Sequence, residues 1–232
     1  MSVRPVVLAW SGGKDSSLAL AALRADPSVE VVAVLTTITR EYDRISIHGV
    51  RRAVLEAQVA ALGLPLVEVT IPPAATNAAY EEAFADALAT LRHQRPDVQH
   101  MAFGDLFLAD VRAYRERVLP PLGWTPVFPL WGMDTPALAQ KFVRAGYRAI
   151  LTCVDTTQLA AEFAGREFDA SLLTALPATV DPCGERGEFH TCVYAGPIFR
   201  YPIAVQTGER VRRDGRFEYC DVTLVGAGAS AA

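Results

Sequence analysis

A short turn near the start of the chain combines two glycines with hydroxyls, a cation and a carboxylate. The run Ser11–Ser16 reads Ser-Gly-Gly-Lys-Asp-Ser and lies between the apolar segments Val6–Trp10 and Ser17–Leu23. Adjacent glycines let the backbone approach an anion closely, and the unpaired N–H groups that open a following helix point to the same place. Lys14 adds a positive charge. The order strand, glycine turn, helix therefore predicts a phosphate-binding site, and an ordinary tight turn is the alternative.

The spacing within this turn differs from that of a Walker A loop, which has four residues between its glycines. Ser11–Ser16 resembles instead the PP-loop of the ATP pyrophosphatases, S-G-G-x-D-S after the first strand. This resemblance implies that the chain splits ATP between the α- and β-phosphates, transfers AMP to a carboxylate or carbonyl oxygen, and releases pyrophosphate.

Polar residues also follow the other expected strands. In an open parallel sheet, ligands bind at the carboxyl ends of the strands, where Thr36, Gly104-Asp105, Trp131–Asp134 and Asp155-Thr156 are expected. Such a fold places loops at this edge whether or not they bind a ligand. The polar clusters taken together are therefore stronger evidence of a binding site than any one of them. The expected nucleotide-binding residues are Ser11, Gly12, Gly13, Lys14, Asp15, Ser16, Ser17, Thr36, Gly104 and Asp105.

ATP is normally delivered with Mg²⁺, which prefers carboxylate oxygens and retained waters. Asp15 is the first candidate ligand for this metal and Asp105 the second. The alternative for Asp15 is a carboxylate that only complements the first turn of its helix. Lys14 is expected to contact phosphate and to stabilise charge on the leaving pyrophosphate, with a solvated lysine as the alternative.

A second constellation lies in the segment Asp181–Thr191, where glycines alternate with two carboxylates before an expected strand. Carboxylates resist burial without partners, so a functional loop is favoured over a plain surface turn. Glu185 and Glu188 could bind a cationic group, position an amine nucleophile or take its proton. His190 titrates near neutrality in its ordinary state and could take that proton; a structural histidine is the alternative.

Three further motifs follow the PP-loop along the chain: P-L-W-G-x-D at Pro129–Asp134, G-E-x-G-E-[YF] at Gly184–Phe189 and G-P-[LI]-F at Gly196–Phe199. With these four motifs in this order, the chain resembles one group of PP-loop ATPases, the diphthine-ammonia ligases. The resemblance covers residues 6–199, and His48 sits where the group has a histidine-containing motif. It implies adenylation of the carboxylate of diphthine on elongation factor 2, followed by attack of ammonia.

Carried over to this chain, the resemblance assigns catalytic roles to Lys14, Asp15, Glu185 and Glu188. The substrate-binding residues that it implies are His48, Trp131, Asp134, Gly184, Glu185, Gly187, Glu188, Phe189 and His190.

The chain departs from the group at three positions. Arg186 replaces a glycine, Phe189 stands for the common tyrosine, and His190 follows where an acidic residue is frequent. A close variant that acts on another carboxylate therefore stays open. A nucleotide-binding module without turnover is a second class. An RNA-modifying PP-loop enzyme is a third, and it would need a basic tract or an appended RNA-binding domain, neither of which the sequence shows.

Composition limits the partners. The 232 residues carry a net charge of −4, which argues against non-specific nucleic-acid binding. We expect neither a targeting segment nor a membrane span, and hence a cytoplasmic protein.

The four cysteines form no C-x-x-C pair, so reduced thiols are expected rather than a zinc or redox motif. The oligomeric state is left open, with a homodimer as one option.

The elements that must position these residues alternate strand and helix through the first two thirds of the chain, which predicts an α/β fold with a doubly wound parallel sheet. Six strands are expected in this sheet, the last at Arg148–Val154, and Asn77 is expected to cap one helix. A small antiparallel subdomain should follow, with a hairpin at Asp214-Gly215. The expected domains are 1–155 for ATP and 156–225 for the substrate, with a disordered tail at 226–232.

Overall fold

The computed structural model describes residues 3–46 and 48–226, which form two compact units. The units are interleaved along the chain. The first comprises Met1–Ser11, Asp15–Ser46 and Leu64–Asp134, and the second comprises Gly12–Lys14, Ile47–Gly63 and Thr135–Ala232.

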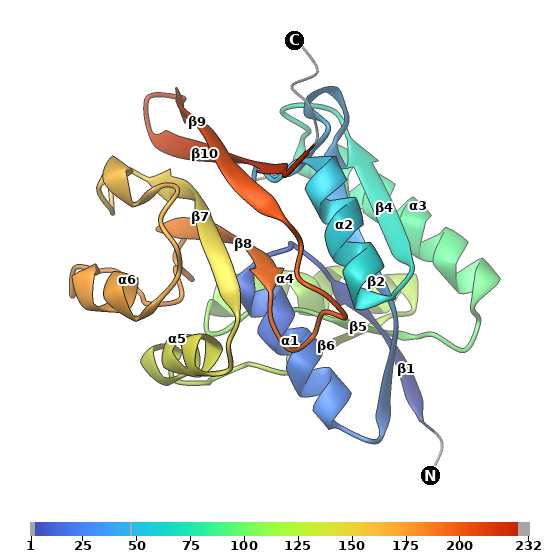
Figure 1. The fold of residues 1–232 in the computed structure, drawn as a ribbon. Helices are drawn as coiled ribbons and strands as arrows, with labels where there is room; N and C mark the ends of the chain where they lie inside the picture. The colour runs from blue at the N-terminus through green and yellow to red at the C-terminus, as the bar shows by residue number, and fades with distance from the viewer. Residues whose placement is uncertain (1–2, 47, 227–232) are drawn as a thin grey trace. The chain divides into compact units, whose positions relative to one another are not determined.

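The first unit contains a parallel sheet in the strand order β4-β2-β1-β5-β6, to which a short strand β3 adds an antiparallel pair with β2 (Figure 1). Its strands are β1 (Arg4–Ala9), β2 (Val29–Thr39), β3 (Arg44–Ile45), β4 (Leu66–Ile71), β5 (His100–Ala102) and β6 (Thr125–Val127). Val6, Val7 and Leu8 are fully buried, as expected for a central strand covered on both faces. The predicted α/β fold class is thus confirmed.

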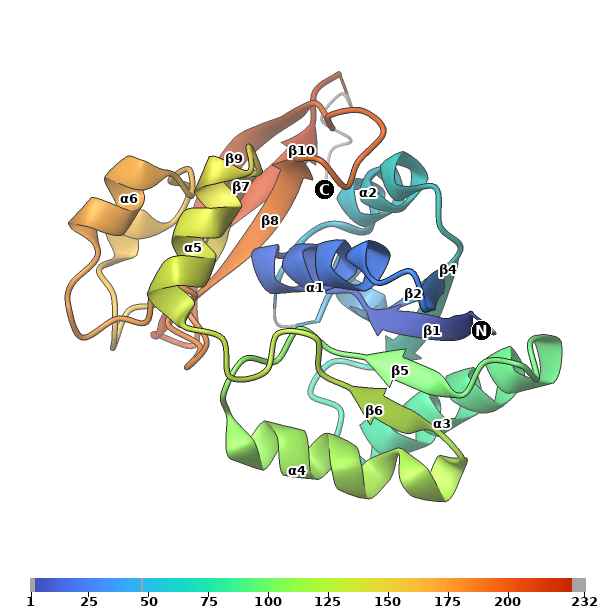
Figure 2. The ribbon, with the colours of Figure 1, turned by 90° about the horizontal axis from the view of Figure 1, so that it is seen from below.

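Helices cover both faces of this sheet. Figure 2 shows α1 (Lys14–Ala25) on one face, with α3 (Asn77–Gln94) and α4 (Ala109–Val118) on the other. The short 3₁₀ segments of this unit are η1 (Arg40–Tyr42) and η2 (Pro120–Leu122). The cap of α3 corrects the prediction for Asn77: the side chain of Thr76 accepts a hydrogen bond from the Ala79 amide, so Thr76 is the N-cap.

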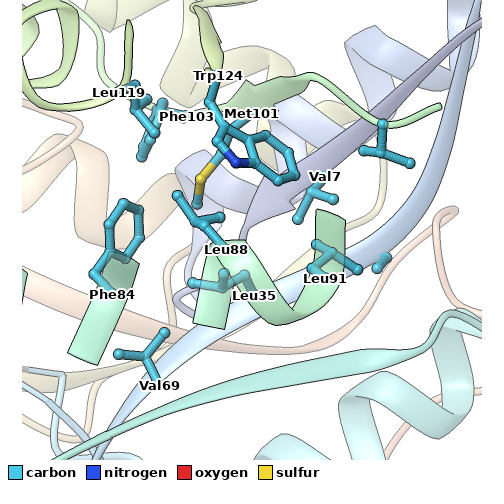
Figure 3. Close-up of a cluster of buried hydrophobic side chains, with 12 residues drawn as sticks. Val7, Leu35, Val69, Phe84, Leu88, Leu91, Met101, Phe103, Leu119 and Trp124 are labelled. Atoms are coloured by element: carbon cyan, nitrogen blue, oxygen red, sulfur yellow. The ribbon is translucent and has the colours of Figure 1, made fainter. Parts of the chain in front are cut away.

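The core beneath α3 is a single apolar cluster (Figure 3). Phe84, Leu88 and Leu91 recur along α3 at intervals of three and four residues and meet Val7 and Trp124 from the sheet side. The other members are Ala33, Leu35, Val69, Val98, Met101, Phe103 and Leu119. This burial holds the carboxyl ends of β1 and β5 in a fixed register.

The second unit contains an antiparallel sheet in the order β8-β7-β10-β9. Its strands are β7 (Arg148–Asp155), β8 (Phe189–Ala195), β9 (Val205–Arg213) and β10 (Phe217–Leu224), and its helical segments are α2 (Arg52–Leu62), α5 (Thr135–Arg144), η3 (Ala161–Phe163) and α6 (Ala170–Ala175). The antiparallel C-terminal sheet is confirmed. The strand predicted at Arg148–Val154 was placed in the wrong sheet: it pairs antiparallel with β8 and β10. Asp155 therefore does not extend the parallel edge.

Two local predictions hold. Gly63 ends α2 in the left-handed conformation, with φ of 67°. Asp214 and Gly215 both have positive φ, 52° and 63°, as a type I′ hairpin turn requires. The predicted tail begins at Gly226, and 227–232 lie outside the described residues. The domain boundary at residue 155 stays a prediction.

Helix α2 belongs to the second unit although strands of the first unit precede and follow it in sequence. It buries Val54 and Leu55 and lies against β10. Arg51, at its N-terminus, forms an ion pair of 2.6 Å with Asp221 of that strand. The amide of Arg200 donates to the Ala61 carbonyl at 2.8 Å, which fixes the other end.

Within the described ranges, none of the helices has the length and apolar character needed to span a bilayer. The four cysteines are free and buried in this part of the chain.

Candidate nucleotide and carboxylate site

The glycine turn after β1 adopts the backbone that its sequence predicts. Gly12 has φ of 73°, and a Cβ there would lie 2.6 Å from Oε1 of Gln58. The Gly12 carbonyl accepts hydrogen bonds from the Val193 amide at 2.8 Å and from Nε2 of Gln58 at 3.0 Å. Only glycine combines this φ with so close an approach at low cost. The turn is thus fixed by β8 and by one side chain of α2.

Gln58 is a site residue that the sequence analysis missed. Its side chain is fully buried, and Nε2 also donates to the Val193 carbonyl at 2.7 Å. A buried amide needs such partners, because leaving it unsatisfied costs about 1–3 kcal/mol. The signal was present: Gln58 lies three and four residues after Leu55 and Val54, on the apolar stripe of its helix.

Lys14 joins the phosphate turn to the second constellation, more than 160 residues away in sequence. The residue is only 2% exposed, and its amide donates to Oγ1 of Thr191 at 3.1 Å. Its ammonium donates to the carbonyl oxygen of Cys183 and lies 5.6 Å from the ring centre of Phe189. In the second unit, Lys14 and the segment that begins at Cys183 therefore form one cluster.

The glycines of this segment have different surroundings. Gly184 has φ of 66°, and a Cβ there would meet the Phe189 carbonyl oxygen at 2.7 Å. Gly187 has φ of 81° with no atom within 4 Å of the same position. Gly184 is thus required by backbone conformation and by packing, whereas Gly187 is required by conformation alone.

The Glu188 carboxylate accepts hydrogen bonds from two backbone amides of the segment Asp181–Thr191. The Glu188 side chain is 1% exposed, Oε1 accepts from the Asp181 amide at 2.9 Å, and Oε2 accepts from the Arg186 amide at 2.9 Å. Arg186, half exposed, places its guanidinium 3.8 Å from the same carboxylate. Asp181 continues the network by accepting from Thr135 at 3.0 Å. These bonds give Glu188 a positioning role in the loop, while Glu185 remains partly exposed on it.

His48 and His190 lie side by side, with ring centres 4.5 Å apart. Burial lowers the pKa of His190 to about 4, and the charge of Lys14 adds to this shift. Burial also lowers the pKa of His48 well below its usual range, with contributions from His190 and Lys14. The expectation that His190 titrates near neutrality is therefore wrong. Both imidazoles are neutral at pH 7 and can accept or donate a hydrogen bond without carrying charge.

In the first unit, the start of α1 lies against the end of β5. A Cβ on Gly104 would lie 2.9 Å from the backbone carbon of Asp15 and 3.0 Å from the Ser16 amide. Oγ of Ser11 donates to Oγ of Ser16 at 3.2 Å, and Ser17 is buried. The structure thus brings Gly104 to the turn, as predicted. Thr36 lies on β2, the strand that pairs with β1, and its hydroxyl donates to the Trp10 carbonyl at 2.7 Å.

Asp105 follows Gly104 at the point where this glycine packs against the Asp15 backbone. Burial raises the pKa of Asp105, the nearby charge of Asp15 raises it further, and Arg115 opposes both. Two hard oxygen donors fit Mg²⁺, which usually takes one or two carboxylates and completes its shell with water and phosphate oxygens. In the described part of the chain, no group of three or more His, Cys, Asp or Glu side chains could hold a metal.

Trp131 lies farther along the same unit. Its ring contacts Phe128 edge-on, with centres 5.9 Å apart, and the Arg112 guanidinium lies 4.8 Å above it. Asp134 is exposed. The contacts of Trp131 place it with helix α4, and its predicted substrate role, like that of Asp134, stays a prediction.

Known proteins resemble the chain over nearly its whole length. Residues 4–126 match the family model of the diphthamide synthase N-terminal domain, and residues 134–223 match that of the diphthamide synthase C-terminal domain. A diphthine–ammonia ligase of Schizosaccharomyces pombe is 27% identical over 90% of this chain but only 37% of its own length. A diphthine–ammonia ligase of Danio rerio is 26% identical over 87% of this chain and 86% of its own length. The chain belongs to the diphthamide synthase family.

Proposed function

We propose that the chain is an ATP-dependent, AMP-forming ligase that converts the carboxylate of diphthine on elongation factor 2 to an amide with ammonia. The observation that carries this proposal is the contact of Lys14, the lysine of the phosphate turn, with the Cys183–Glu188 segment. A nucleotide-binding turn and a carboxylate-rich loop are thereby joined by one buried cation. The family relatives named as diphthine–ammonia ligases support the same reaction.

In the first step, the substrate carboxylate oxygen attacks the α-phosphorus of ATP. An O–P bond forms, the bond between the α-phosphorus and the bridging oxygen breaks, and pyrophosphate leaves. The positive φ of Gly12 lets the backbone of the turn approach phosphate oxygens closely. Lys14 supplies the charge that stabilises the leaving group. Asp15 and Asp105 would hold Mg²⁺, which neutralises phosphate charge when bound.

In the second step, ammonia attacks the acyl carbon, the C–N bond forms, and AMP leaves with the oxygen that linked it to the acyl group. The attacking nitrogen must lose a proton. Glu185 is partly exposed on the loop and suits this task better than Glu188, whose two oxygens accept backbone N–H groups. The burial and the Lys14 charge that lower the pKa values of His48 and His190 would also disfavour an ammonium cation there and favour uncharged ammonia.

The test measures the products of ATP. The protein is mixed with ATP, Mg²⁺ and ammonium, with and without elongation factor 2 that carries diphthine, and AMP, ADP and pyrophosphate are separated. We expect AMP and pyrophosphate only with the acceptor. Lys14→Ala should lower the rate about 100-fold or more, because it removes a preorganised charge from the leaving group. Lys141, an exposed residue on α5, provides the matched control Lys141→Ala.

Three results would contradict the proposal in different ways. Tight ATP binding without cleavage under any condition identifies a nucleotide-binding module. Cleavage to ADP excludes AMP transfer. Formation of AMP with another carboxylate, but not with diphthine, keeps the chemistry and changes the substrate, as the presence of Arg186 in the loop would then explain.

A further inference from the structure

Arg115 on α4 is fixed in place by apolar surfaces rather than by hydrogen bonds. Its guanidinium carbon lies 4.6 Å from the ring centre of Phe103 and 5.6 Å from that of Tyr114. Phe103 is itself buried in the core beneath α3. Aromatic faces hold a guanidinium in position while leaving its N–H groups unused, because the contact involves the plane of the group.

The carboxylate of Asp105 does not accept a hydrogen bond from Arg115 either. Nε of Arg115 lies 3.8 Å from Oδ2 of Asp105, which is an ion pair by distance but too long for a hydrogen bond. Both atoms are buried, and neither has a hydrogen-bond partner in the described part of the chain. The ion pair and the two ring contacts are the interactions of the Arg115 side chain there. The Arg115 side chain is 23% exposed, but its buried and unsatisfied Nε donor costs free energy unless a ligand binds it.

The surroundings indicate which ligand. Asp105 follows Gly104, which lies against Asp15 and Ser16 at the first turn of α1. Asp105 and Asp15 therefore both lie at this turn, where Gly104 packs against the Asp15 backbone. An anion alone would be repelled by these carboxylates. A magnesium-bound polyphosphate would instead place its metal on the carboxylates and its free oxygens on the arginine.

We propose that Arg115 binds the β- and γ-phosphates of ATP and so holds the pyrophosphate that leaves. This inference rests on the proposed function for the choice of ATP as the nucleotide. Arg115 contributes a planar group with several donors, which can bind two phosphate oxygens at once.

The experiment measures binding by calorimetry and therefore needs no turnover. The probes are α,β-methylene-ATP with Mg²⁺, which resists cleavage at the reacting bond, and AMP, which lacks the β- and γ-phosphates. We expect Arg115→Met to weaken binding of α,β-methylene-ATP about 10- to 100-fold, because charge-assisted hydrogen bonds are lost. Binding of AMP should change less than about twofold. Arg115→Lys should weaken binding of α,β-methylene-ATP less than Arg115→Met does, since lysine keeps the charge but lacks the planar group with several donors.

Arg117 provides the matched control. It lies on the same helix, its guanidinium is 5.3 Å from the ring centre of Tyr114, and its side chain is 67% exposed. Arg117→Met removes the same charge and should leave both affinities unchanged. Equal binding of α,β-methylene-ATP by Arg115→Met and the unaltered protein would overturn the inference, as would equal losses for both probes. Failure of the unaltered protein to bind α,β-methylene-ATP would overturn the proposed function together with this inference.

Discussion

At the scale of single residues, the two neighbouring histidines give the fold a pH dependence. In an unfolded chain a histidine has a pKa of about 6.5. In the folded protein the pKa of His190 is about 4, and that of His48 is also lowered. Between these values the unfolded chain binds protons that the folded chain does not bind. The free energy of unfolding should therefore fall as the pH falls from about 6.5 toward 4.

The slope of this change is measurable. Each such group contributes up to about 1.4 kcal/mol per pH unit within its window. Urea unfolding between pH 4.5 and 8 should show a shallower slope for His190→Gln than for the unaltered protein. His93→Gln, which alters an exposed residue of α3, should leave the slope unchanged. Equal slopes for all three proteins would mean that His190 takes up its proton over the same pH range in the folded protein as in the unfolded chain.

Gln58 and the contacts of Arg115 show what single-residue reasoning from the sequence omits. The types and spacing of Ser11–Ser16 predicted the phosphate turn, because glycine, lysine and hydroxyl positions are local properties. The amide that fixes the Gly12 carbonyl comes from another helix. The Phe103 ring beside Arg115 lies just after β5, so this contact depends on how α4 packs in the first unit. Such contacts are set by tertiary packing, which a local pattern does not contain.

At the scale of elements, the two glycines of the Gly184–Glu188 loop can be separated by substitution. Gly187→Ala should cost about 1–2 kcal/mol of stability, because only its left-handed φ is affected. Gly184→Ala should cost more, because its new methyl group also meets the Phe189 carbonyl at the start of β8. Urea unfolding checks the difference, and ligase assays should show the larger loss for Gly184→Ala.

Comparable stability of the two alanine variants would contradict this view of the loop. It would mean that β8 moves freely enough to accommodate a methyl group. In that case the hydrogen bonds from the Asp181 and Arg186 amides to the Glu188 carboxylate would not fix the loop as described.

Helices and strands were predicted well where periodicity and end signals agree, as in α3 and in the β9–β10 hairpin. The strand β7 shows the limit. Its apolar run fits a buried parallel strand and a buried antiparallel strand equally well, since both faces of β7 are covered. Its partners β8 and β10 lie later in the chain, so only pairing over long sequence distances decides its sheet.

At the scale of the whole molecule, the basic residues are nearly all arginines. Lys14 and Lys141 are the only lysines in the sequence. A lysine-directed acyl phosphate of ATP should therefore modify at most these two side chains. We expect modification of Lys14 that excess Mg·ATP prevents, whereas modification of Lys141 should not respond to ATP. Peptide mass spectrometry distinguishes the two, and an ATP-independent reaction at Lys14 would argue against nucleotide at the turn.

The interleaving of the two units has a consequence for synthesis on the ribosome. Helix α2 is complete at Leu62, but β7 begins at Arg148 and β10, against which α2 lies, ends at Leu224. Roughly 155 residues separate Leu62 from Phe217, the first residue of β10, so synthesis at about 5–20 residues per second gives a delay of about 8 to 31 seconds. During that interval the nascent chain carries the apolar face with Val54 and Leu55 before its partner strands exist. The second unit therefore closes only after translation reaches β10, and a polypeptide released before Phe217 retains an uncovered helix face that chaperones can bind.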